Sequence, residues 1–197
     1  IKILRWLNIS ELSGLTKYLF SLAIGLGVLA YGVMTLGLVG LLRPAAIYLW
    51  LGLATLLAWR ELAQIGDHLP AWLRQQKRAF GDLAVPEKGL IILAGLIFGF
   101  SAIQALAPPW GYDSLMYHLQ APRLFLDAGR INLQPDTWQA NFPMTIEMLY
   151  TIGLAVRSDS FARLVHLAYT GLAVLGCFSL GRHLLGRVGG WLAAAIL

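Results

Sequence analysis

The amino-acid sequence predicts an all-α protein that crosses a membrane about five to six times and carries one long external loop. Of its 197 residues, 58% are hydrophobic and only 13% are charged, whereas a soluble domain usually carries about 25% charged residues. The apolar residues also form long runs, and residues 18–42 contain no Asp, Glu, Lys or Arg. A helix needs about 20 such residues to span the hydrocarbon core of a membrane.

The expected helices follow one another in a simple order. Residues 18–42 form the first span, and Pro44 starts a second helix that ends near residue 65, since proline is well tolerated in a first helical turn. Residues 66–88 are polar and predict a loop with a short amphipathic helix at about 72–80. The remaining expected spans are residues 89–107, a shorter one at about 144–156, one at about 161–181, and one that begins near 188.

The chain is expected to divide at residue 88. Residues 1–88 predict an amino-terminal tail, a two-helix hairpin and a cytoplasmic loop, and residues 89–197 predict a second transmembrane unit with a polar loop at 108–143. Lys and Arg are concentrated in the tail and around 60–88, and such segments stay in the cytoplasm. We therefore expect the amino terminus in the cytoplasm and the 108–143 loop outside. The segment GRHLLGR at 181–187 disagrees, because this order of spans places it outside as well.

The net charge and the cysteine content bear on two further features, a nucleic-acid partner and an internal disulfide. A net charge of +5 would suggest nucleic acid for a soluble domain, but basic cytoplasmic loops explain it in a membrane protein, and we expect no nucleic-acid partner. The single cysteine, Cys177, permits no internal disulfide. The chain starts with Ile and ends within an apolar run, so we expect a fragment of a longer polypeptide.

Polar and charged residues are concentrated in the stretch PPWGYDSLMYHLQAPRLFLDAGRI, residues 108–131. Residues 111–121 have a helical composition, which Pro122 interrupts. A second short helix is expected to begin at Pro122 and to end at Ala128, because Gly129 is a natural C-terminal stop. We expect both helices to lie on the membrane surface with their apolar faces toward lipid.

Asp113 and His118 are the first candidate functional residues. Asp113 could cap the first short helix, which contributes about 1 kcal/mol, and it could also act as a general base or hold a divalent metal. His118 could bind a phosphate oxygen or a metal. No second histidine lies at ligand spacing, so a structural, hydrogen-bonded histidine is the better interpretation.

Arg123 and Glu147 are further candidates. Arg123 is spaced i, i+4 from Asp127 and could pair with it or contact a phosphate; surface pairs contribute little to stability. Glu147 lies within a short apolar segment, where an ionisable group is a functional candidate by default, although its closeness to the loop could keep it wet.

Three segments of the sequence resemble the amino-terminal part of the polytopic GT-C glycosyltransferases, such as the protein mannosyltransferases and aminoarabinose transferases. These segments are YDSLMYHLQAPRLFLDAGRI, NFPMTIEMLYTIGLAV and LGRHLLGRVGGWLAAAIL. The resemblance covers residues 89–197. In that family the first large external loop carries a catalytic acidic residue, and Asp113 occupies this position. Many members have two adjacent acidic residues there, whereas Ser114 follows Asp113 here, which weakens a two-carboxylate metal model.

The resemblance implies transfer of a sugar from a polyprenyl-phosphate-linked donor to an acceptor on the external side. Asp113 would be the catalytic carboxylate, and a divalent metal ion could bind there as a cofactor. Arg123 or Arg130 would stabilise the charge that develops on the lipid phosphate. The expected substrate-binding residues are Tyr112, Tyr117, His118, Arg123, Arg130 and Glu147.

The expected partners are the polyprenyl-phosphate sugar, membrane lipids and other membrane proteins, and the expected location is the bacterial cytoplasmic membrane. The alternative is a non-catalytic membrane scaffold subunit of a larger complex, in which Asp113 merely caps its helix. A transporter would need charged or broken helices near the bilayer midplane, and only Glu147 points that way.

Overall fold

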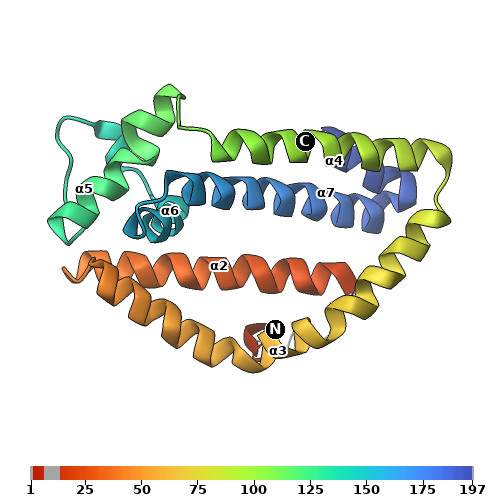
Figure 1. Ribbon diagram of the computed structural model, residues 1–197, viewed down its shortest axis with the longest axis horizontal. Helices are drawn as coiled ribbons and strands as arrows, with labels where there is room; N and C mark the ends of the chain where they lie inside the picture. Colours follow the sequence, from red (N-terminus) through yellow and green to blue (C-terminus); the bar gives the residue numbers. More distant parts are fainter. Residues whose placement is uncertain (1, 7–13, 197) are drawn as a thin grey trace.

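A computed structural model describes residues 2–6 and 14–196, and over these residues the chain forms helices and connecting loops without a β-strand (Figure 1). The predicted all-α class is confirmed. Within the described residues, four helical segments are long and apolar enough to cross a membrane, whereas the sequence predicted five to six spans. They are α2 (Gly14–Leu38), the Pro44–Gln64 part of α3 (Pro44–Gly81), α4 (Val85–Leu106) and α7 (Asp159–Ile196).

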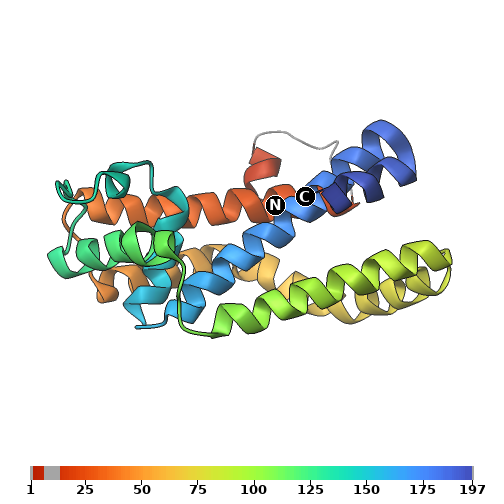
Figure 2. The same cartoon turned by 90° about the horizontal axis from the view of Figure 1, so that it is seen from above.

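The long helices run along the longest axis of the molecule (Figure 1). Helix α2 packs against α3 and α7, and α4 packs against α7. The short helices between residues 112 and 155 gather at one end of this bundle in both views (Figures 1 and 2). We call this the loop end. The opposite end, which contains residues 82–84 between α3 and α4 and the kink at Gly186, is the turn end.

Helix α3 corrects the predicted loop at 66–88. It continues as one helix of 38 residues to Gly81, so that only residues 82–84 separate it from α4. The residues beyond 65 are polar, but Ala, Leu, Arg, Lys and Gln are frequent among them, and these residue types favour a helix even without an apolar face. Pro44 lies at the start of α3, as predicted.

Helix α6 (Thr145–Ala155) corrects the predicted fourth span. Its 11 residues extend about 16 Å at a rise of 1.5 Å per residue, whereas the hydrocarbon core is about 30 Å thick. Residues 147–154 of α6 are all buried, because α2, α3, α5 (Gln120–Ala128) and α7 contact the helix. The apolar segment therefore forms a protein core and does not cross a membrane. Met148 and Phe125 lie at the centre of this core with residues of α2 and α3.

Because α6 is short, α7 also runs in the opposite direction from the predicted fifth span. Helix α7 begins at the loop end and runs to the turn end, where Arg187 contacts Glu87 of α4. Residues 181–187 thus lie at the same end as the α3–α4 turn, and the conflict that the sequence-based topology left at GRHLLGR disappears. The non-helical Gly186 divides α7 near the expected boundary between the last two segments.

Two short helices follow α4, as predicted, but they meet at Leu119 and not at Pro122. The first is the π-helix η1 (Ser114–His118), and the second is α5 (Gln120–Ala128). Pro122 lies in the first turn of α5 and has no N–H to donate to the carbonyl four residues back. The Leu119 N–H instead donates to the Ser114 carbonyl at 3.0 Å, the i→i+5 spacing that defines a π-turn.

Helix α5 ends at Gly129, whose φ of +69° favours glycine, as expected. Its buried residues are Ala121, Pro122 and Phe125, and Ala121 and Phe125 belong to the protein core. The prediction that this apolar face turns toward lipid is therefore wrong. The Leu42 N–H donates to the Gly129 carbonyl at 2.9 Å, and this bond ties the loop to the α2–α3 connection.

Candidate functional site

A cavity of about 350 Å³ lies at the loop end, between α4, η1, α6 and α7. This volume is at the lower end of the range for small-molecule sites. Its apolar lining includes Ala105, Leu119, Ala162 and Leu167. Its polar lining comprises Ser101, Gln104, Ser114, His118, Tyr150, Arg163, His166 and Thr170.

The long helices present their polar residues to this cavity because of their spacing. Arg163, His166 and Thr170 stand at i, i+3 and i+7 on α7, so they share one face of the helix. Ser101 and Gln104 stand at i and i+3 in the last turns of α4. The polar faces of α4 and α7, two mostly apolar helices, therefore line the same cavity.

His118 is hydrogen-bonded to Glu147. Their Nδ1 and Oε1 atoms lie 2.7 Å apart, and Glu147 is only 8% exposed. When Glu147 is a carboxylate, it accepts from Nδ1–H, which leaves Nε2 of His118 as the nitrogen without this partner. The expected hydrogen-bonded histidine is present, and its partner is one of the expected site residues.

A second pair joins Tyr150 of α6 to His166 of α7. The Tyr150 hydroxyl lies 2.8 Å from Nδ1 of His166. Burial raises the pKa of Tyr150, and the negative charge of Glu147 raises it further. The phenol therefore keeps its proton and can donate a hydrogen bond.

Tyr117 links Asp113 to the His118–Glu147 pair. Its ring centroid lies 4.2 Å from that of His118. Burial raises the pKa of Tyr117, and the charges of Asp113 and Glu147 act in the same direction. The phenol therefore keeps its proton in the neighbourhood of these two carboxylates.

Asp113 does not act as a helix cap. Its backbone is already helical, with φ −62° and ψ −37°, and its side chain makes no capping hydrogen bond. The carboxylate is exposed and has no hydrogen bond or ion pair within the part of the chain that the structure describes. Asp113 itself does not line the cavity, whereas the next residue, Ser114, does.

A metal was expected at Asp113, but the described residues do not form a set of metal ligands there. Among residues 2–6 and 14–196, no group of three His, Cys, Asp or Glu side chains is arranged to hold a metal ion. A metal bound by Asp113 would take its other ligands from water or from a substrate phosphate, as magnesium often does.

The predicted arginines lie elsewhere. Arg123 forms an ion pair with Asp159 at the start of α7 and not with Asp127, because folding brings α7 next to α5. Arg130 is exposed, and Tyr112 is 68% exposed. None of these three lines the cavity.

Arg163 supplies the cation that the sequence analysis missed. Its Nη1 donates to the carbonyl of Ala107, and Ser160 Oγ donates to the Leu106 carbonyl at 3.4 Å. These bonds satisfy carbonyls at the C-terminal end of α4, which favours positive charge. Among the residues that the structure describes, the Arg163 side chain makes no other hydrogen bond or ion pair, and it lines the cavity.

Tyr150, Arg163 and His166 could have been found from sequence. Arg163 and His166 interrupt an apolar span, and an ionisable group there is a functional candidate. Tyr150 follows Glu147 by three residues, close to one helical turn. The signal, a polar or ionisable group within an apolar segment, is the same one that identified Glu147.

No protein-family model, no curated protein and no solved structure matches the chain.

Proposed function

We propose that the chain is part of a GT-C-type membrane glycosyltransferase that takes a sugar from a polyprenyl-phosphate donor. The observation that supports this most is the polar cavity at the loop end, which joins one cation, Arg163, to several hydrogen-bonding groups at the ends of apolar helices. A lipid-linked sugar needs this combination. Its chain stays among apolar helices, while its phosphate and sugar need charge and hydrogen bonds.

In this proposal Arg163 contacts the donor phosphate, and His118 and Tyr150 hydrogen-bond to the donor. Arg163 replaces Arg123 in this role, because Asp159 already pairs with Arg123. Positive charge fixed beside the phosphate stabilises the negative charge that develops there in the transition state.

Asp113 is the proposed general base. Its carboxylate accepts the proton of the acceptor hydroxyl, while the acceptor oxygen bonds to the anomeric carbon. The bond from that carbon to the phosphate oxygen breaks, and polyprenyl phosphate leaves with the electron pair. An exposed carboxylate without a protein partner is available for this proton transfer.

The scaffold alternative explains Asp113 only as a helix cap. The capping hydrogen bond is absent, so this explanation loses its support. A scaffold also has no need of a polar cavity with an arginine in it, because a buried polar group costs free energy unless it is satisfied.

The experiment is Asp113→Asn in the full-length protein, reconstituted in vesicles with polyprenyl-phosphate mannose or polyprenyl-phosphate aminoarabinose as donor. The release of polyprenyl phosphate is measured. Loss of a general base lowers a rate by about 10²- to 10⁴-fold, and we expect a loss in this range at normal protein levels. Asp127→Asn, an exposed carboxylate on α5, is the matched control and should keep its rate.

Two outcomes would contradict the proposal. A near wild-type rate for Asp113→Asn removes Asp113 from the chemistry. A wild-type protein that releases no polyprenyl phosphate from either donor, with or without added Mg²⁺, favours the scaffold.

We also propose that the turn end faces the cytoplasm and the loop end faces outside, in a bacterial cytoplasmic membrane. Arg182 and Arg187 join Lys88 at the turn end, and Lys/Arg-rich segments stay in the cytoplasm. Cysteines introduced as Gln75→Cys and Leu133→Cys in a Cys177→Ser background test this orientation. An impermeant thiol reagent on intact cells should label position 133; preferential labelling of position 75 reverses the assignment.

A further inference from the structure

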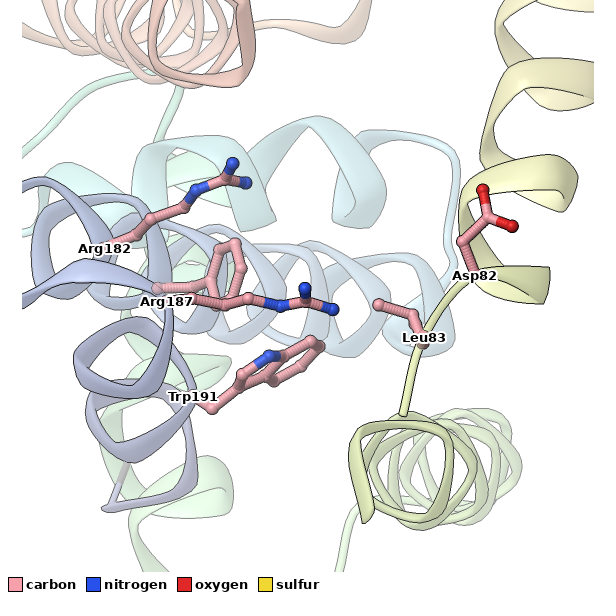
Figure 3. Close-up of a pocket in the computed structure, with 6 residues that line it drawn as sticks. Asp82, Leu83, Arg182, Arg187 and Trp191 are labelled. Atoms are coloured by element: carbon pink, nitrogen blue, oxygen red, sulfur yellow. The ribbon is translucent and has the colours of Figure 1, made fainter. Parts of the chain in front are cut away.

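A second cavity, of about 320 Å³, lies at the turn end of the bundle, and Figure 3 shows the residues that line it. It is lined by Asp82, Leu83, Phe178, Arg182, Arg187 and Trp191. The two cavities share no residue, so a ligand at the turn end does not depend on the proposed glycosyl transfer.

Glycines allow the chain to reverse next to this cavity. Gly186 has φ +74° and ψ −166°, a conformation that only glycine adopts readily. The chain reverses there, and Gly181 packs so closely that a Cβ on it would lie 2.5 Å from the Gly189 carbonyl oxygen. The reversal brings Arg182 and Arg187, from the two sides of the kink, to the same wall (Figure 3).

Glu87 holds two residues of this wall in position. It forms an ion pair with Arg187 and accepts a hydrogen bond of 3.0 Å from Nε1 of Trp191. The Trp191 ring packs edge-on against Phe178, with centroids 4.9 Å apart. The charge of Arg187 is therefore balanced within the protein, and the indole is fixed.

Arg182 and the Asp82 side chain are left without protein partners among the residues that the structure describes. Figure 3 shows Arg182 on the α7 wall and Asp82 across the cavity at the end of α3. Leu83, Phe178 and Trp191 make the surface between them largely apolar. The cavity thus offers one unpaired cation, one unpaired carboxylate and an apolar floor.

We propose that this cavity binds the headgroup of a phospholipid that carries a phosphate and a primary amine. The phosphate contacts Arg182 and the exposed side of Arg187, and the ammonium faces Asp82. The acyl chains lie along exposed leucines of α7 such as Leu184 and Leu185. Basic pockets between membrane helices bind lipid phosphates, and Trp favours the membrane interface.

The carboxylate decides which headgroup fits. An anionic headgroup without an amine, such as phosphatidylglycerol, leaves Asp82 unpaired beside a negative phosphate, and like charges in contact oppose binding. An ethanolamine headgroup carries a negative phosphate for the arginines and a positive ammonium for Asp82. We therefore expect phosphatidylethanolamine to bind more tightly than phosphatidylglycerol.

Native mass spectrometry of the full chain tests this proposal. The protein is released from micelles that contain phosphatidylethanolamine or phosphatidylglycerol with the same acyl chains. Arg182→Gln should weaken both lipids about tenfold, the effect of losing one charge-assisted hydrogen bond. Asp82→Asn should weaken phosphatidylethanolamine and leave or improve phosphatidylglycerol.

Matched controls are Arg74→Gln and Asp67→Asn, exposed charges on α3 that do not line the cavity; neither should change lipid binding. Circular dichroism and gel filtration check that each variant folds. Equal retention of the two lipids, or an Arg182→Gln variant that binds like wild type, overturns the proposal. Glycerophosphoethanolamine or inorganic phosphate binding as tightly as the lipid would overturn the lipid assignment in favour of a soluble ligand.

Discussion

The two ends of the helical bundle differ in whether their polar groups pair with one another. At the loop end four of the candidate residues form two hydrogen-bonded pairs: His118 with Glu147, and Tyr150 with His166. At the turn end Arg182 and Asp82 line a cavity, and neither side chain has a partner among the residues that the structure describes. Pairing fixes the shape of the first cavity, because a buried polar group must be satisfied. The unpaired charges of the second cavity leave room for a charged ligand.

Packing differs between the two ends as well. The loop end has a protein core in which α6 is buried over residues 147–154. The turn end depends on close approaches within α7, of Gly181 to Gly189 and of Gly190 to Phe178. Substitutions that remove volume should therefore damage the loop end, and substitutions that add volume should damage the turn end.

The largest expected effect is at the loop end. Met148 is 0% exposed at the centre of the core, and Met→Ala in a packed core costs about 2–5 kcal/mol. We expect Met148→Ala to lower the free energy of unfolding by this amount, measured by denaturant titration in detergent. Leu185→Ala at the turn end, 77% exposed, is the control and should change it little. Equal losses would mean that the two ends are packed alike.

A smaller effect is expected at the turn end. The added methyl of Gly181→Ala would meet the Gly189 backbone at 2.5 Å, and overpacking typically costs about 1–3 kcal/mol. Gly176→Ala is the matched control in the same helix, since a Cβ there meets nothing within 4 Å, and Ala favours a helix over Gly. Denaturant titration should show that Gly181→Ala destabilises and Gly176→Ala does not. Two variants of equal stability would contradict the close glycine packing.

The sequence predicted much of the fold because the helices depend on local signals. The long apolar runs, Pro44 at a helix start, and Gly129 at a helix end are such signals, and each lies where it was expected. Helix α6 was misread as a span because hydropathy does not distinguish burial in protein from burial in lipid. Its length was the better indicator, since 11 residues are too few to cross.

The site was predicted less completely because its contacts join distant parts of the chain. Glu147 and His118 were both candidates, but their pairing depends on how α6 packs beside η1. The spacing allows Arg123 to pair with Asp127 or to contact a phosphate, whereas its partner in the structure, Asp159, is 36 residues away. Local spacing identifies which residues are unusual, and the packing of the helices decides which of them meet.

The smallest expected effect concerns the stability that Asp113 contributes. Its carboxylate is exposed and makes no capping bond, so Asp113→Ala should change the free energy of unfolding by less than about 0.5 kcal/mol, as for most surface positions. Loss of a working cap costs about 1 kcal/mol, and denaturant titration can separate the two values.

Glu87→Ala is the comparison for Asp113→Ala at the turn end. Glu87 accepts from the Ala84 N–H at 3.0 Å as well as from Arg187 and Trp191, and each hydrogen bond contributes about 0.5–1.5 kcal/mol. Glu87→Ala should therefore destabilise measurably where Asp113→Ala does not. If Asp113→Ala is equally destabilising, its carboxylate has a structural role. If Asp113→Ala is as stable as wild type but releases no polyprenyl phosphate, the charge of Asp113 serves chemistry alone.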